Sequence, residues 1–235
     1  MPEFEFDFNY LIRLFSEEGT FEQKMIDFIG DVNINIYSPI VVFDKLICDG
    51  FRPLETFKER MATLPESFSK ETVLDIGCNT GYMLMNIKKH RMAGLCYGID
   101  TSDQCIFVSK VITHYEKLDN IDFEASLASN FIKRILNQEV QKFDNILCFG
   151  VFEFRNKIEN DFIPDVVKCA NKKVIIEFAN HPHNRKSKEE VLEYFKVFEE
   201  FGTLKTTFLE YQNRPVLEID VSKKQEEKQP IVLSL

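Results

Sequence analysis

Apolar runs alternate with amphipathic runs through most of this chain, and each kind predicts a different element. Apolar runs of about four to eight residues are typical of buried strands, whereas amphipathic runs repeat with the period of a helix. The predicted strands are 73–76, 95–100, 121–125, 143–150 and 173–178. The predicted helices are 83–91, 103–117, 131–136, 164–170 and one that follows Ser187. This alternation predicts an α/β domain with a mostly parallel sheet.

The end of the domain has a different pattern. Ser187-x-x-Glu190 has the form of a capping box for a helix that closes at Gly202. The segments 203–211 and 215–221 then follow, joined by Gln212-Asn213-Arg214, and predict an antiparallel hairpin.

Residues 1–66 precede this alternation. Apolar positions predict two short helices that end at Gly19 and Gly30, and a third helix that runs to about Leu64. We therefore expect an N-terminal helical extension or lid over 1–66, the central domain over 67–222 and a charged tail over 223–235. Alternating phenylalanine and acid over 4–8 predicts an apolar edge that docks on the core or on a second copy in a homodimer.

Composition narrows the class of protein. Hydrophobic residues make up 44% and charged residues 29%, as in globular proteins, and no apolar run approaches the roughly 18 residues of a membrane span. The six cysteines form no C-x-x-C pair, so we expect reduced thiols in a cytoplasmic protein, without a metal site. The acidic N-terminus is unlike an export signal. The net charge of −9 disfavours broad binding to nucleic acid.

The stretch VLDIGCNTGY, residues 73–82, carries the main candidate site. An apolar run with one acid, Asp75, ends at Gly77, and Gly81 opens the next amphipathic run. This pattern predicts a buried strand, a tight loop and a helix start, which can hold a polar ligand above a parallel sheet. Gly77 lets the backbone approach the ligand, and Gly81 lets the helix pack closely on its strand. The N–H groups of residues 79–82 are expected to be free for an anionic group.

The spacing of the glycines distinguishes two ligands. The dinucleotide fingerprint G-x-G-x-x-G needs glycines where this chain has Asn79 and Tyr82. The run Asp75-x-Gly77-x-x-x-Gly81 instead resembles motif I of class I S-adenosylmethionine (SAM)-dependent methyltransferases. The alternative is an ordinary βα turn without a ligand.

The resemblance implies the Rossmann-like, seven-stranded fold of that family, with a C-terminal antiparallel hairpin. It also implies SAM as cofactor and S-adenosylhomocysteine (SAH) as product. In that family the acid corresponding to Asp75 serves the amino group of the methionine moiety. The loop backbone, here including Asn79, Thr80 and Gly81, serves its carboxylate.

Asp100 ends the next strand, roughly 20 residues past Gly77, where a carboxylate can bind both ribose hydroxyls. The family resemblance extends to this position, which corresponds to motif II. The alternative is that Asp100 caps the following helix. A capping box formed by Thr101 and Gln104 would instead leave Asp100 free for the ribose.

The remaining cofactor candidates rest on the same resemblance. Thr101 follows Asp100, Ser126 and Leu127 lie where the family contacts adenine, and Phe149 borders the methyl group. The phenylalanine ring can stabilise a sulfonium through its π face. Arg52 precedes the helix before motif I and corresponds to an arginine near the cofactor or substrate carboxylate. The alternative for Arg52 is a surface ion pair.

Candidate bases lie at the carboxyl ends of the central strands, where ligands bind in open α/β sheets. They are His181 and His183 after the fifth strand and Glu153 after the fourth. Histidine titrates near neutral pH and can take a proton from a hydroxyl. The alternatives are that both histidines are surface loop residues and that Glu153 pairs with a nearby arginine.

These patterns predict an enzyme, a SAM-dependent methyltransferase acting on an O or N atom of a small polar metabolite. A sugar, a sugar nucleotide or a cell-surface glycan precursor would fit, and no membrane partner is expected. The acidic charge favours such a substrate over the first alternative, a tRNA or protein methyltransferase. The second alternative is a non-catalytic SAM-binding partner subunit.

Overall fold

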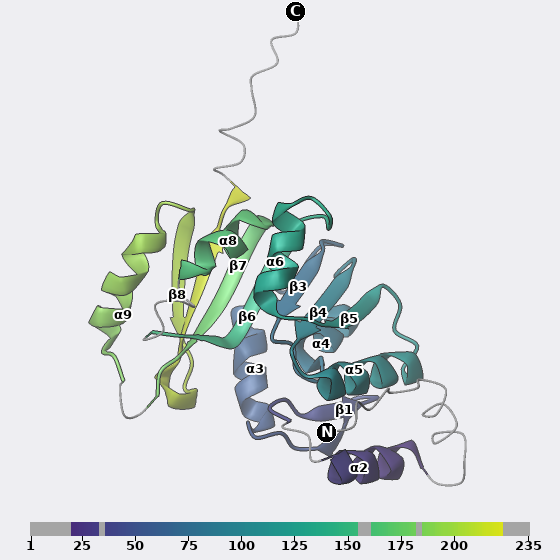
Figure 1. Cartoon of the computed structure of the whole chain (residues 1–235). Helices are drawn as coiled ribbons and strands as arrows, with labels where there is room; N and C mark the ends of the chain where they lie inside the picture. The colour runs from purple at the N-terminus through teal and green to yellow at the C-terminus, as the bar shows by residue number, and fades with distance from the viewer. Residues whose placement is uncertain (1–19, 33–35, 155–160, 182–184, 223–235) are drawn as a thin grey trace, which may run out of the picture.

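The structure, a computed structural model, describes residues 20–32, 36–154, 161–181 and 185–222. At its centre is a seven-stranded sheet with the strand order β5-β4-β3-β6-β7-β9-β8 (Figure 1). The strands are β3 Val73–Ile76, β4 Cys96–Asp100, β5 Ile121–Ala125, β6 Phe143–Glu153, β7 Ala170–Ala179, β8 Thr203–Phe208 and β9 Pro215–Asp220. Within this sheet, β9 alone runs in the opposite direction to the other strands, so it pairs antiparallel with β7 and β8. The predicted fold, including the terminal hairpin, is confirmed.

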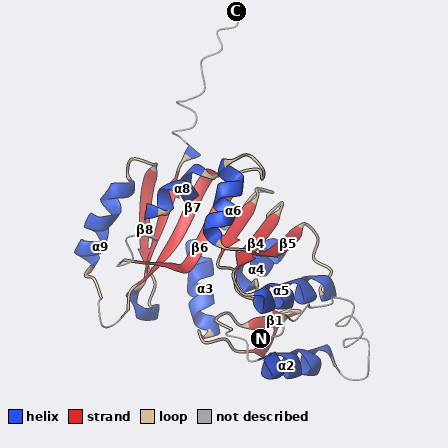
Figure 2. Ribbon diagram, viewed as in Figure 1, coloured by secondary structure: helices blue, strands red, loops and turns tan. Residues whose placement is uncertain are grey.

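Helices cover both faces of this sheet (Figure 2). They are α4 Tyr82–His90, α5 Asp103–Tyr115, α6 Ala128–Leu136, α8 Ile163–Lys168 and α9 Lys188–Phe195. The capping box of Ser187 and Glu190 is present. However, the α-helical part of α9 ends at Phe195 and a 3-10 turn, η2 Lys196–Phe198, continues it, so the predicted end at Gly202 is wrong.

Neighbouring residues of the central strands point into two separate cores. Val73 and Ile175 belong to the core under α4 and α5, whereas Leu74 and Ile176 belong to the core under α6, α8 and α9. Because both sheet faces are buried, these strands read as continuous apolar runs rather than as alternating ones. The carboxyl ends of the parallel strands therefore remain as the edge where a ligand can be held.

The N-terminal extension contains α2 Phe21–Val32, the strands β1 Ile40–Val42 and β2 Lys45–Cys48, and α3 Leu54–Thr63. Helix α2 continues past its predicted end at Gly30, and the first predicted helix lies outside the described residues. The β1–β2 hairpin was not predicted. Its turn places Phe43 and Asp44 at positive φ, whereas the usual sequence signal for such a turn is Asn-Gly or Asp-Gly.

Two further observations concern composition. The six cysteines are all free thiols, and all except Cys48 are buried. In the part of the chain that the structure describes, no helix combines the length and apolar character needed to cross a bilayer.

Candidate active site

A cavity of about 380 Å³ opens at the carboxyl ends of the central strands. The predicted site residues that line it are Arg52, Gly77, Asn79, Asp100, Phe149, Glu153 and His181. They come from the N-terminal extension, the loop after β3 and the ends of β4, β6 and β7. The fold therefore brings together residues from five separate parts of the sequence.

Other predicted residues lie outside the lining of this cavity. Asp75 and Thr80 are buried beside it, with 3% and 1% of their surface exposed. Thr101 is exposed, and Leu127 is 57% exposed after β5. Gly81, which is buried, and Ser126, which is partly exposed, do not line the cavity either. His183 lies outside the described residues.

The loop after β3 is held partly by its own hydrogen bonds. The Asn79 N–H donates to Asp100 Oδ2 at 2.9 Å, and the Gly81 N–H donates to the Cys78 carbonyl at 2.9 Å. The prediction that residues 79–82 all present free N–H groups is therefore wrong for these two. The loop closes because Gly77 and Gly81 adopt positive φ, 74° and 76°.

Both glycines also face side chains at close range. A Cβ on Gly77 would lie 2.7 Å from the Val151 side chain, and one on Gly81 would lie 2.7 Å from the Phe123 ring. The close packing expected of Gly81 is thus made with β5, not with its own strand.

Thr80 Oγ1 is buried and has no hydrogen-bond partner among the described residues. The hydrogen bonds of such a buried hydroxyl are usually satisfied by water or by a bound group. Together with the open lining at Gly77 and the carboxylate of Asp100, it fits a small polar ligand such as the methionine and ribose portions of SAM.

Asp100 is not free in the way that was predicted. Its Oδ1 accepts the Ser102 N–H at 2.9 Å, and its Oδ2 accepts the Asn79 N–H. The predicted capping box is wrong, because Ser102, with an extended backbone, caps α5 by accepting the Cys105 N–H. Each carboxylate oxygen has a second lone pair, and Asp100 lines the cavity, so its contact with a ribose stays a prediction.

Asn79 joins the N-terminal extension to the loop after β3. Its Oδ1 accepts the Tyr37 and Ser38 N–H groups, both at 3.1 Å, and the Ser38 hydroxyl at 3.2 Å. Tyr37 and Ser38 line the cavity. The Asn79 side chain therefore holds a wall of the cavity, a role that the sequence did not indicate.

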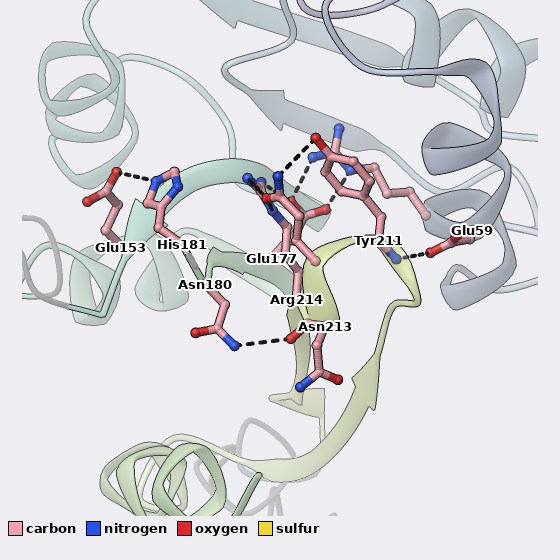
Figure 3. Close-up of polar contacts among 10 residues, drawn as sticks. Glu59, Glu153, Glu177, Asn180, His181, Tyr211, Asn213 and Arg214 are labelled. Carbon is pink, nitrogen blue, oxygen red and sulfur yellow. Dashed lines mark hydrogen bonds and ion pairs between the residues drawn. The ribbon is translucent and has the colours of Figure 1, made fainter. Parts of the chain in front are cut away.

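The sequence also missed a buried ion triad in the wall of the cavity, and Figure 3 labels two of its members, Glu177 and Arg214. Glu177 of β7 is fully buried and accepts two bonds from Arg60, at 2.5 and 2.7 Å, and one from Arg214 at 2.9 Å. Burial alone would raise the pKa of Glu177, but both arginines outweigh it and hold the pKa below its usual value. The one available signal was an acid inside an apolar strand, since neither arginine is near Glu177 in sequence.

Phe149 lies against this triad. Its ring lines the cavity, and the Arg60 guanidinium carbon is 5.4 Å from the ring centroid. Cation–π contact with an arginine therefore already occupies part of the ring that was predicted to face a sulfonium.

Arg52 lies in the cavity wall without a carboxylate partner among the residues that the structure describes. Its guanidinium is 5.7 Å from the Tyr37 ring centroid and lies close to Gly150. Burial, together with Arg60 and Arg214, lowers the pKa of Arg52 to about 10, so the side chain is still charged at neutral pH. The alternative of a surface ion pair is not what this geometry shows.

Glu153 and His181 form a pair at the ends of β6 and β7 (Figure 3). His181 Nε2 is 3.2 Å from Glu153 Oε1, and both side chains are half exposed. Buried Asn180 anchors the loop, because it donates to the Asn213 carbonyl and accepts the Lys186 N–H. Among the described residues Glu153 thus pairs with the histidine and not with an arginine, and these two candidate bases form one unit.

Asp75 gives a prediction for stability against pH. Burial, helped by Asp100 and opposed by Arg60, raises the pKa of Asp75 to about 8 from an ordinary value of 3.8. Between these values the folded protein binds a proton that the unfolded chain releases, so the free energy of unfolding falls as pH rises from about 4 to about 8. We expect Asp75→Asn to gain stability over the wild type across this window.

Urea unfolding at about pH 5, 7 and 8.5 measures the difference. The exposed Asp119→Asn should follow the wild-type pH profile. Parallel profiles for the wild type and Asp75→Asn would show that Asp75 is ionised in the fold.

Residues 67–226 match the family model described as "Methyltransferase domain". The uncharacterized protein RP028 of Rickettsia prowazekii (strain Madrid E) is 27% identical over 114 residues, which cover 48% of this chain and 44% of that protein. The chain thus matches less than half the length of this curated relative.

Solved structures share the fold. A putative SAM-dependent methyltransferase from Streptococcus mutans superposes with a TM-score of 0.59 at 16% identity, covering 75% of this chain and 52% of the other. SMU.776, a putative methyltransferase complexed with SAH, gives a TM-score of 0.54 at 15% identity, with the same coverage, 75% and 52%. At such identities the likeness shows the fold alone.

Proposed function

Because this chain belongs to the methyltransferase domain family, we propose that it is an enzyme that binds SAM and transfers its methyl group to an O or N atom of a small polar metabolite. When bound, SAM supplies an electrophilic methyl group on a sulfonium centre. The work left to the protein is to align the acceptor with that methyl group and to exclude water.

The residues at and beside the cavity fall into candidates for binding the cofactor and candidates for acting on the acceptor. Asp100, in the cavity lining, is the candidate for the ribose, and the loop at Gly77 allows close approach of the backbone. Asp75 and Thr80, buried beside the loop, are the remaining candidates for the methionine moiety. These groups lie toward β3 and β4, whereas the His181–Glu153 pair lies on the β6–β7 side.

The His181–Glu153 pair is the observation that supports transfer to an acceptor with a proton to lose. A carboxylate within hydrogen-bonding distance of a histidine favours one orientation of its ring. A hydroxyl acceptor gains from such a base, whereas an amine needs only to be neutral. The pair at the cavity therefore favours a hydroxyl or a protonated amine over an acceptor that needs no base.

The small cavity and the charge of −9 support a metabolite such as a sugar or sugar nucleotide as acceptor. The test incubates the protein and tritiated SAM with a small-metabolite pool and, separately, with bulk tRNA and cell protein. Label in a metabolite that gains one CH₂ group supports the proposal. Label in tRNA or protein alone would contradict the acceptor class, and SAM binding without any turnover would indicate a partner subunit.

His181→Gln is expected to lower kcat on a hydroxyl acceptor by about 10²–10⁴-fold, because the base is lost. SAH affinity should stay unchanged, since His181 lies on the β6–β7 side. Single-turnover rates and calorimetry measure the two effects. His90→Gln, a matched change at an exposed histidine of α4, should leave both unchanged. Wild-type turnover in His181→Gln would remove the base from the mechanism.

A further inference from the structure

The β6–β7 side of the cavity carries an excess of positive charge. Arg52, Arg60 and Arg214 all line the cavity, and Glu177 is the carboxylate that Arg60 and Arg214 share. The charged groups that affect the pKa of Arg52 are Arg60, Arg214 and Glu177. Glu153 on the same side is already paired with His181. Arg52 is thus a desolvated cation beside two others, with no carboxylate of its own among the described residues.

The backbone is shaped to admit the Arg52 guanidinium. The pairing of β6 with β7 shifts its register between Phe149 and Phe152, which produces a bulge at the end of β6. Within it Gly150 has a φ of 72°, and a Cβ there would lie 2.8 and 2.9 Å from the two terminal nitrogens of Arg52. Any other residue at position 150 would displace the guanidinium, so the local structure and the arginine fit each other.

Arg52, which lies against Gly150 of β6, is set apart from Asp100, the candidate for the ribose. Asp100 stands on β4, and β3 lies between β4 and β6 in the sheet. Arg52 shares the cavity with His181, the candidate base.

We propose that the methyl acceptor carries a carboxylate or phosphate group and that Arg52 binds this anion beside the His181–Glu153 pair. This inference rests on the proposed function, since it names the class of acceptor for the same site. A guanidinium binds either group through two parallel hydrogen bonds and so fixes orientation as well as position. Binding also removes the cost of a desolvated cation next to two like charges. The acceptor is thereby an acidic metabolite whose reactive hydroxyl or amine is held at a set distance from its anionic group.

The test uses inorganic phosphate and acetate as separate probes of the SAH complex. SAH fills the cofactor site with its own carboxylate, and chloride keeps the ionic strength constant. Titration followed by NMR compares the wild type, Arg52→Met and Arg134→Met. Arg134 is a matched control, because it is also partly exposed but pairs with Glu124 at 2.6 Å.

We expect saturable binding of at least one probe to the wild type and to Arg134→Met. In Arg52→Met the binding should be weaker by on the order of tenfold or more, the effect of losing a hydrogen bond between charged groups. The dissociation constant of SAH should agree within about twofold in all three proteins.

Three results would overturn the proposal. The first is equal probe binding in Arg52→Met and the wild type. The second is no probe binding in the wild type, with or without SAH. The third is competition between the probe and SAH, together with weaker SAH binding in Arg52→Met. The last result would assign Arg52 to the cofactor carboxylate. If the wild type does not bind SAH at all, the proposed function fails, and titration of the ligand-free protein still decides whether Arg52 binds anions.

Discussion

Replacing Glu177 by glutamine is expected to destabilise the protein by about 3–5 kcal/mol, the range for breaking a buried ion pair. The substitution leaves Arg60 and Arg214, each only 2–3% exposed, side by side without an anion. It also weakens three hydrogen bonds that join α3, β7 and the β8–β9 connection. Urea unfolding followed by circular dichroism measures the loss.

Glu218→Gln is the matched control for this prediction. Glu218 lies on the neighbouring strand β9 and pairs with Lys173 at 2.7 Å, but both side chains are partly exposed. Exposed pairs contribute up to about 1 kcal/mol, so a much smaller effect is expected there. Equal losses in the two variants would show that the triad has no special part in stability.

Asp100→Ala is expected to weaken SAM binding by about 1.5–3 kcal/mol, since hydrogen bonds to a charged group are lost. Calorimetry with SAM and SAH measures the change. Asp103→Ala, at the exposed acid that begins α5, should bind as the wild type does. An unchanged affinity in Asp100→Ala would rule out the ribose contact.

The structure shows why one variant is not enough at this position. Asp100 also accepts the N–H groups of Asn79 and Ser102, so alanine could weaken binding by releasing the loop. A SAH analogue without the ribose 2′-hydroxyl separates the two causes. It should bind the wild type more weakly than SAH does, whereas Asp100→Ala should bind both equally. If removal of the 2′-hydroxyl weakens binding equally in the wild type and in Asp100→Ala, the effect of the substitution comes from the loop.

Elements of the sheet could be predicted because their causes are local. Burial on both faces makes Val73–Ile76 and the core of β6 continuous apolar runs, and the Ser187 capping box marks the start of α9. The prediction that Thr101 caps α5 was wrong, because the adjacent residues Thr101 and Ser102 can each cap a helix. The backbone dihedrals of Ser102, set by the loop around Asp100, decided between them.

The parts of the site that escaped prediction depend on contacts between distant residues. Arg60 and Glu177 are 117 positions apart, and Ser38 and Asn79 are 41 apart. Nothing near Arg60 in sequence distinguishes it from a solvated arginine on the surface of α3. The fold alone determines that this arginine is buried and that Arg52, eight positions earlier, is left without a carboxylate among the described residues.

The hydrogen bonds from Tyr37 and Ser38 to Asn79 have a consequence for thermodynamic linkage. They connect the N-terminal extension to the loop after β3. This loop contains Gly77, and its Asn79 N–H donates to Asp100. If a ligand in the loop favours the docked state of the extension by some factor, docking must favour the ligand by the same factor. Substitutions at Ser38, which lies on the cavity wall far from Asp100 in sequence, would thus change cofactor affinity and the protection of the extension from proteolysis together.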